Sequence, residues 1–191
     1  MQRICRIVGK AERKPAMDLR KKRTQRSIIN AFIALRAKKP LEKITVKELA
    51  DAALIHKATF YQYYPDIYAL SDSLENEALE AILRDIRSPD ELFLAPKEAS
   101  LRLYHAILAQ GELFFILFSG NRQRVLLDKL EDRLKESICS RFPQYRNNLE
   151  FDILMTVLIQ GCSHAFLNYR LQDPEQVIEI LGQASERLLL K

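Results

Sequence analysis

The chain has 191 residues, enough to bury a hydrophobic core and to form one or two small domains. No run approaches the roughly 18 consecutive apolar residues of a membrane-spanning helix, and no apolar run follows the basic N-terminus as a signal peptide requires. The net charge of +5 is unevenly divided: residues 1–66 carry 16 Lys and Arg against 6 Asp and Glu, whereas residues 67–191 carry 14 against 19. The N-terminal third is therefore suited to bind a polyanion.

Three cysteines are widely spaced and form no metal-ligand pair: Cys5, Cys139 and Cys162. This pattern predicts reduced thiols in a cytoplasmic protein. With only five glycines and little strand-like alternation, the sequence predicts an all-α fold.

Residues 1–17 contain Gly9 and Pro15 and no periodic apolar face, so we expect a flexible basic extension, in which Met17 is an alternative start. A first helix is predicted over residues 19–38 and ends before Pro40, because a residue before proline avoids helical geometry. The run RKKR at residues 20–23 gives this helix its charge. Such a run binds an anion or is only a solvated surface.

Residues 45–64 predict two short helices joined by a tight turn. Thr45 can cap the first helix and Glu48 can complete a capping box. The apolar face of that helix is formed by Val46, Leu49, Ala50 and Ala53. In the second helix, over residues 57–64, Phe60 and Tyr64 share one face and polar side chains cover the rest. A short polar helix of this kind is typical of a helix-turn-helix that enters the DNA major groove.

Further helices are predicted over residues 66–87, 97–110, 112–118, 121–141, 148–171 and 174–190, with glycine or proline near most boundaries. The sequence thus predicts about nine helices in two domains. Residues 18–66 form a three-helix head with the helix-turn-helix, and residues 67–191 form a helical C-terminal domain.

The stretch ITVKELADAALIHKATFYQYY, from Ile44 to Tyr64, resembles the TetR-type transcriptional repressors in order and spacing. The motif match covers roughly residues 20–70, and beyond it only the helical layout is similar. The resemblance implies that the first three helices bind double-stranded DNA, while the others bind a small molecule and form a homodimer. The candidate DNA-binding residues are Arg20, Lys22, Thr45, His56, Lys57, Ala58, Thr59, Tyr61, Gln62 and Tyr63.

Three positions depart from the family pattern. Leu54 stands where a glycine usually supports the turn, so we expect the turn to differ locally. His56 replaces a small capping residue, and neutral histidine caps poorly but could contact DNA instead. Ile67 replaces a lysine that often opens helix four, so one phosphate contact is missing.

A single helix-turn-helix reads only a few base pairs. Specific binding therefore requires two of these units, held about 34–36 Å apart so that they enter successive major grooves. The resemblance therefore implies a homodimer that binds a pseudo-palindromic operator. The last two helices of each protomer would form the dimer interface. Two apolar stripes are candidates for the dimer interface, although each stripe could instead face its own core: Leu154, Leu158, Gly161 and Ala165; Val177, Leu181, Ala184 and Leu188.

The resemblance also implies a pocket for a hydrophobic effector, with no cofactor. Candidate ligand-binding residues are the apolar Tyr104, Leu108, Phe114, Phe118, Met155 and Phe166, with the polar His105, Gln160 and His164. For each of them, ordinary packing in a helical core is the alternative interpretation.

These observations predict a ligand-responsive DNA-binding regulator, a repressor by the family default. An alternative remains open: a TetR-like interaction protein that binds DNA weakly and without specificity, and has a protein or small-molecule partner. An enzyme is disfavoured, because the sequence has no nucleophile elbow and no Gly-rich phosphate loop. Cys162 and His164 would point about 200° apart on a helix, and the histidines lack metal-ligand spacing. No catalytic or metal site is expected, and residues 1–26 lack the apolar face of a membrane-surface helix.

Overall fold

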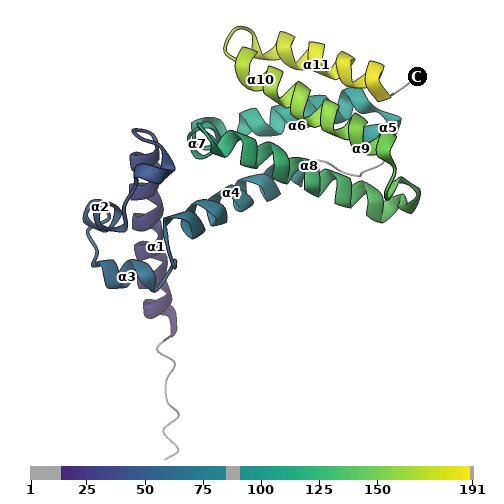
Figure 1. Ribbon diagram of the computed structural model, residues 1–191. Coiled ribbons are helices and arrows are strands. Elements are labelled where there is room, and N and C mark those ends of the chain that lie inside the picture. The colour runs from purple at the N-terminus through teal and green to yellow at the C-terminus, as the bar shows by residue number, and fades with distance from the viewer. Residues whose placement is uncertain (1–13, 85–90, 190–191) are drawn as a thin grey trace, which may run out of the picture. The chain divides into compact units, whose positions relative to one another are not determined.

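The computed structural model describes residues 14–84 and 91–189, and all regular secondary structure within these ranges is helical (Figure 1). The all-α prediction is confirmed. The chain divides into two compact units, Met1–Ile67 and Tyr68–Lys191, close to the predicted division after residue 66.

The first unit contains α1 (Lys14–Arg36), the 3-10 turn η1 (Leu41–Lys43), α2 (Val46–Ala52) and α3 (Lys57–Tyr61). In this unit α1 packs on α2, and α2 packs on α3. The side chains that fill its core are at most 1% exposed: Ile28, Phe32, Leu41, Leu49, Ala50 and Phe60. Helix α1 includes residues 14–17, which were expected in the flexible extension; the rest of that extension, residues 1–13, lies outside the described residues.

The second unit follows with α4 (Ile67–Leu83), α5 (Glu91–Leu94), α6 (Pro96–Ala109), α7 (Gly111–Leu117), α8 (Arg122–Arg141), the 3-10 turn η2 (Pro143–Tyr145) and α11 (Pro174–Leu189). Between η2 and α11 runs one continuous helical stretch of α9 (Leu149–Thr156), the π-helix η3 (Val157–Cys162) and α10 (Ser163–Tyr169). The predicted helices are all present. The short α5 and the two 3-10 turns were not predicted, and the predicted end of the fourth helix at residue 87 lies outside the described residues.

Helices α6 and α11 pack closely over a buried contact. Gly182 makes this approach possible, because a Cβ atom at that position would lie 2.8 Å from Cδ1 of Leu101. Next to it, Ser100 Oγ donates a hydrogen bond of 2.8 Å to Ser185 Oγ, and both serines are buried. The hydrogen bond satisfies hydroxyls that would otherwise be costly to bury.

Candidate nucleic-acid interface

Helix α2 begins at the cap that the sequence predicts. The backbone N–H of Glu48 donates to Oγ1 of Thr45 at 3.2 Å. The predicted capping box is not completed, because the Glu48 carboxylate forms an ion pair with Lys39 instead of returning to the cap. Lys39 follows α1, so this ion pair ties the end of α1 to α2.

The turn between α2 and α3 keeps a left-handed residue although it has no glycine. Leu54 has a φ of 56° and is 92% exposed. The Ile55 N–H donates to the Ala50 carbonyl at 3.0 Å, which closes the turn around it. Leu54 adopts a conformation that costs an L-residue about 1–2 kcal/mol.

Helix α3 is shorter than predicted. His56 precedes it without a side-chain capping bond, in line with the poor capping expected of histidine. The helix ends at Tyr61 rather than Tyr64, because the N–H groups of Gln62 and Tyr63 bond three residues back and tighten the last turn. Phe60 and Tyr64 are 0% and 8% exposed, so both lie in the core as expected.

The remaining side chains around α3 face solvent to different degrees. His56, Lys57, Ala58, Tyr61 and Gln62 are exposed, and Thr59 and Tyr63 are half-buried. The Tyr63 hydroxyl donates to the Lys21 carbonyl of α1 at 3.3 Å. This bond places the end of the α3 segment beside the basic run of α1. In that run Arg20, Lys21, Lys22, Arg23 and Arg26 are all exposed.

Ile67 opens α4 but does not point to solvent. It is 5% exposed and belongs to the core, so this position offers no contact to a phosphate.

The ligand-binding candidates do not share one cavity. Phe114 and Phe166 line a cavity of about 10 Å³. Tyr104 lines a second of about 20 Å³, and Met155 lines a third of about 190 Å³. Phe118 is buried and Leu108 half-buried, and neither lines these three cavities.

The polar candidates face elsewhere. His105 is exposed, with Nε2 3.1 Å from the Glu175 carboxylate, and His164 is exposed. Gln160 donates to Glu131 at 2.9 Å and to Asp128 at 3.1 Å. None of the three lines any of these three cavities.

Sequence reasoning missed Ser163 at the start of α10. It is 3% exposed and borders both small cavities, and its Oγ has no hydrogen-bond partner among the described residues. Tyr104, which lines the second of them, is 2% exposed and stacks on Phe166 with ring centroids 4.7 Å apart. Burial raises the pKa of the Tyr104 phenol well above its ordinary value. The hydroxyls of Ser163 and Tyr104 are therefore buried polar groups that carry no charge.

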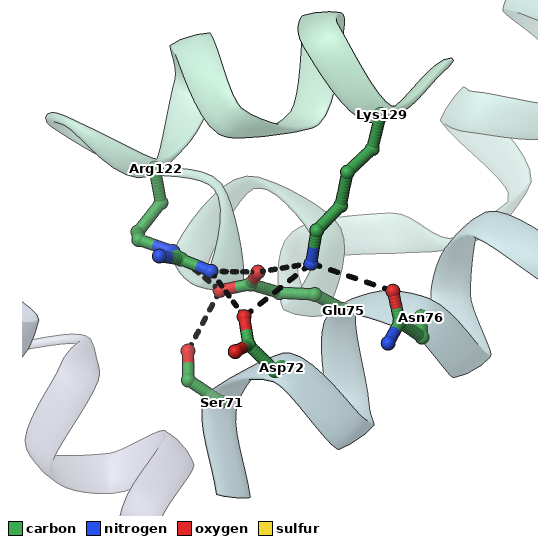
Figure 2. A network of polar contacts seen from close by, with 6 residues as sticks. All are labelled: Ser71, Asp72, Glu75, Asn76, Arg122 and Lys129. Carbon is green, nitrogen blue, oxygen red and sulfur yellow. Dashed lines mark hydrogen bonds and ion pairs between the residues drawn. The ribbon is translucent and has the colours of Figure 1, made fainter. Parts of the chain in front are cut away.

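A network of charges around the buried Glu75 joins α4 to α8 (Figure 2). Arg122 Nε donates to Glu75 Oε1 at 2.8 Å, and its Nη2 donates to Asp72 at 2.6 Å. Lys129 Nζ lies 3.3 Å from Asp72 and 3.5 Å from Glu75, and Ser71 donates to Glu75 at 2.7 Å. Glu75 is fully buried. The bonds to Glu75 raise the pKa of Arg122 further above its ordinary value.

The candidates for the dimer interface fall on different faces. Leu158 and Leu181 are 5% and 7% exposed, so they pack inside the unit. Gly161 is exposed, and the other candidates are half-buried: Leu154, Ala165, Val177, Ala184 and Leu188. The large apolar side chains exposed on these helices are Leu149, Ile153, Val157, Tyr169 and Ile180, at 73%, 53%, 50%, 54% and 56%.

The π-helix η3 interrupts the first of the two stripes, which runs from Leu154 to Ala165. Its hydrogen bonds close at i→i+5 rather than i→i+4, so residues on one face are spaced more widely than a 3.6-residue period requires. A stripe counted at that period therefore leaves its face between Leu154 and Gly161.

No described helix is long and apolar enough to cross a membrane. Within residues 14–84 and 91–189, no group of three or more His, Cys, Asp and Glu is placed to hold a metal ion.

Together the elements define a helix-turn-helix head followed by a helical body. No protein-family model and no curated protein matches the chain. Among solved structures, a protein of Shewanella sp. PV-4 assigned to the TetR family of transcription regulators aligns with a TM-score of 0.59 and 16% identity, over 87% of this chain and 95% of that chain. A TetR family transcription regulator of Marinobacter aquaeolei VT8 aligns with a TM-score of 0.56 and 17% identity, over 90% and 98%.

The chain therefore has the fold of the TetR family regulators, as the resemblance of its helix-turn-helix implied.

Proposed function

We propose that the chain is a transcription regulator that binds double-stranded DNA through α3. The observation that carries this proposal is the exposed polar surface of α3 beside the basic run of α1, held together by the bond from Tyr63 to Lys21. Lysines and arginines supply the salt-dependent attraction to phosphates, and the side chains of a short helix supply contacts to base edges.

The exposed residues divide into two roles. Arg20, Lys22, Lys57 and Thr45 are suited to phosphates, whereas Tyr61 and Gln62 extend from the end of α3 toward solvent, where an amide can bond adenine. His56, Ala58 and Thr59 lie at the start and on the flank of α3 and would approach the same groove. Tyr63 contacts a phosphate only if its hydroxyl gives up the Lys21 carbonyl, so we assign it a smaller role.

We further propose a homodimer, because one such head reads only a few base pairs. The exposed Ile153, Val157 and Ile180, with Gly161 between them in the chain, support an interface on the last helices. Apolar side chains of this size are commonly covered at interfaces, and Gly161 would allow close approach of a helix.

The third part of the proposal is repression relieved by a hydrophobic effector. The two small cavities that Ser163 borders each have room for about one water molecule, so an effector that binds there would have to open the core between α6 and α10. Such a ligand acts only if it binds one conformation better than the other. Helix α4, which follows the head in the chain, is held to α8 by Arg122, so movement of α8 would be passed to α4.

The test is a binding titration of the purified protein with its own upstream DNA and with a shuffled fragment of equal length, each at two salt concentrations. We expect a preference for the upstream DNA that persists at the higher salt. Gln62→Ala should reduce the preference, whereas Arg20→Ala should weaken binding to both fragments about equally and reduce the salt dependence. The control is Lys38→Ala, which removes a charge at an exposed residue just after the end of α1.

A second function is favoured by the strained Leu54, the uncapped His56 and the buried Ile67. In this alternative the chain is a TetR-like interaction protein with weak DNA binding. Equal, salt-sensitive affinity for both fragments would favour it over the regulator.

A further inference from the structure

Four elements of the second unit surround a cavity of about 190 Å³. Phe93 comes from α5, Tyr145 from η2 and Leu189 from the end of α11. The other lining residues are the N-cap Asn148 and residues along α9: Glu150, Phe151, Leu154 and Met155. This cavity is separate from the small ones beside Ser163, with which it shares no lining residue.

Its size fits a single aromatic ring. An engineered protein cavity of about 150 Å³ binds benzene, and the cavity at α9 is somewhat larger. Three of its walls are aromatic: Phe93 and Tyr145 stack at 5.1 Å with an angle of 7°, and Tyr145 and Phe151 stack at 5.0 Å. Phe93 and Tyr145 remain half-buried, which leaves part of each ring for a further offset or edge-to-face contact.

The polar groups select the substituent on that ring. Glu150 carries the only charge among the lining residues, is exposed, and has no ion pair with any residue that the structure describes. An ionised carboxylate only accepts hydrogen bonds, so it favours a donor and repels an anion. Asn148 accepts from the Phe151 N–H at 3.0 Å through Oδ1, which leaves its amide N–H₂ as a donor.

A neutral donor enters an aromatic cavity at a lower desolvation cost than a cation does. The N-terminus of α9 also lies at the cavity, and its dipole offsets part of the attraction that Glu150 exerts on a positive charge. A hydroxyl meets both requirements, because it donates to Glu150 and accepts from the Asn148 amide without a charge of its own.

We propose that this cavity binds a small phenolic molecule, with the ring against Phe93 and Tyr145 and the hydroxyl donating to Glu150. The site goes beyond the proposed function. It concerns binding without DNA, so it holds or fails independently of transcriptional control.

The experiment uses the full chain, labelled with ¹³C at its methionine methyl groups, and titrates phenol, anisole and benzoate in turn. The chain has only three methionines, and Met155→Leu assigns the signal of Met155, which lines the cavity. We expect phenol to shift this signal with a Kd on the order of 0.1–1 mM, as suits a ligand of seven heavy atoms. Anisole, which lacks the donor, should bind about 5–10-fold more weakly, and benzoate should not bind measurably.

Two variants test the residues. Glu150→Gln should weaken the binding of phenol about 3–10-fold and reduce the ratio of the affinities for phenol and benzoate. Glu136→Gln changes an exposed residue that does not line the cavity, so it should leave the affinity and the ratio unchanged. Leu154→Trp should fill the cavity and abolish binding, with circular dichroism to verify folding. The proposal is overturned if phenol leaves the Met155 signal unmoved at about 10-fold above the expected Kd, or if benzoate binds the wild type as well as phenol does.

Discussion

Arg122 on α8 donates two hydrogen bonds to the Glu75 carboxylate on α4 (Figure 2). Its Nε lies 2.8 Å from Oε1, its Nη2 bonds Oε2, and Glu75 is fully buried. A buried carboxylate is tolerated when its oxygens are paired and hydrogen-bonded. Glu75 has Arg122, Lys129 and Ser71 around it. The network therefore fixes α4 against α8. Removing only one partner of the Arg122–Glu75 pair is costly, because it leaves the Glu75 charge buried without that partner.

Replacing Arg122 by methionine should lower the free energy of unfolding by about 3–5 kcal/mol, because it leaves Glu75 buried without its main partner. The double variant Arg122→Met with Glu75→Gln should recover part of this loss, since no charge is then buried. Urea unfolding measures both. Arg124→Met is the matched control: its side chain is 88% exposed and its ion pair with Asp128 spans 3.8 Å, so a change within about 0.5 kcal/mol is expected. Equal effects at the two positions would contradict the structural role of Arg122.

Leu54→Gly should stabilise the protein. Glycine adopts the φ of 56° without steric strain, but it also loses more chain entropy on folding. The net gain should be about 0.5–1 kcal/mol in the free energy of unfolding. Leu54→Ala keeps the Cβ atom and the strain, so it should change stability little. If glycine and alanine behave alike, the turn is not strained at this residue.

Tyr104→Phe should change how stability depends on alkaline pH. Burial raises the pKa of Tyr104 in the folded state above its value of 10.0 in the unfolded chain. The folded state then keeps the proton longer, so this contribution to stability is complete below pH 10 and is lost as pH rises toward the folded pKa. The loss amounts to about 1.4 kcal/mol per pH unit. Urea unfolding at pH 7 and pH 11 should show a smaller decrease for the phenylalanine variant than for the wild type; parallel decreases would contradict a buried phenol.

The head was predictable because its signals are local. Thr45 caps the helix it precedes, and Phe60 and Tyr64 fill the core from one face of the α3 segment. The shorter α3 and the ion pair of Glu48 with Lys39 were not predictable, because both depend on how the chain closes around the turn.

The second unit was predictable only in its helical layout. No local sequence pattern predicts that Arg122 will bind the buried carboxylate of Glu75, because the two residues are 47 positions apart in the chain. The π-helix η3 likewise changes the spacing of the side chains after Thr156, which a count at a 3.6-residue period does not include. The aromatic cavity unites α5, η2 and α9, and neither α5 nor η2 was expected from the sequence.

The exposed stripe on α9 and η3 gives the dimer proposal a direct test. Ile153→Lys should leave the protomer folded, because the side chain is already 53% exposed, but it should weaken the dimer strongly. In a two-fold interface each substitution occurs twice, and burying two lysines without partners should raise the dimer Kd at least about 100-fold. Leu94→Lys, at a residue 80% exposed on α5, should have no such effect. Sedimentation velocity over a concentration series compares the variants, and the operator titration should show a parallel loss of affinity, because two heads must be held together to read two half-sites. A dimer of unchanged strength in Ile153→Lys would place the interface on a different surface.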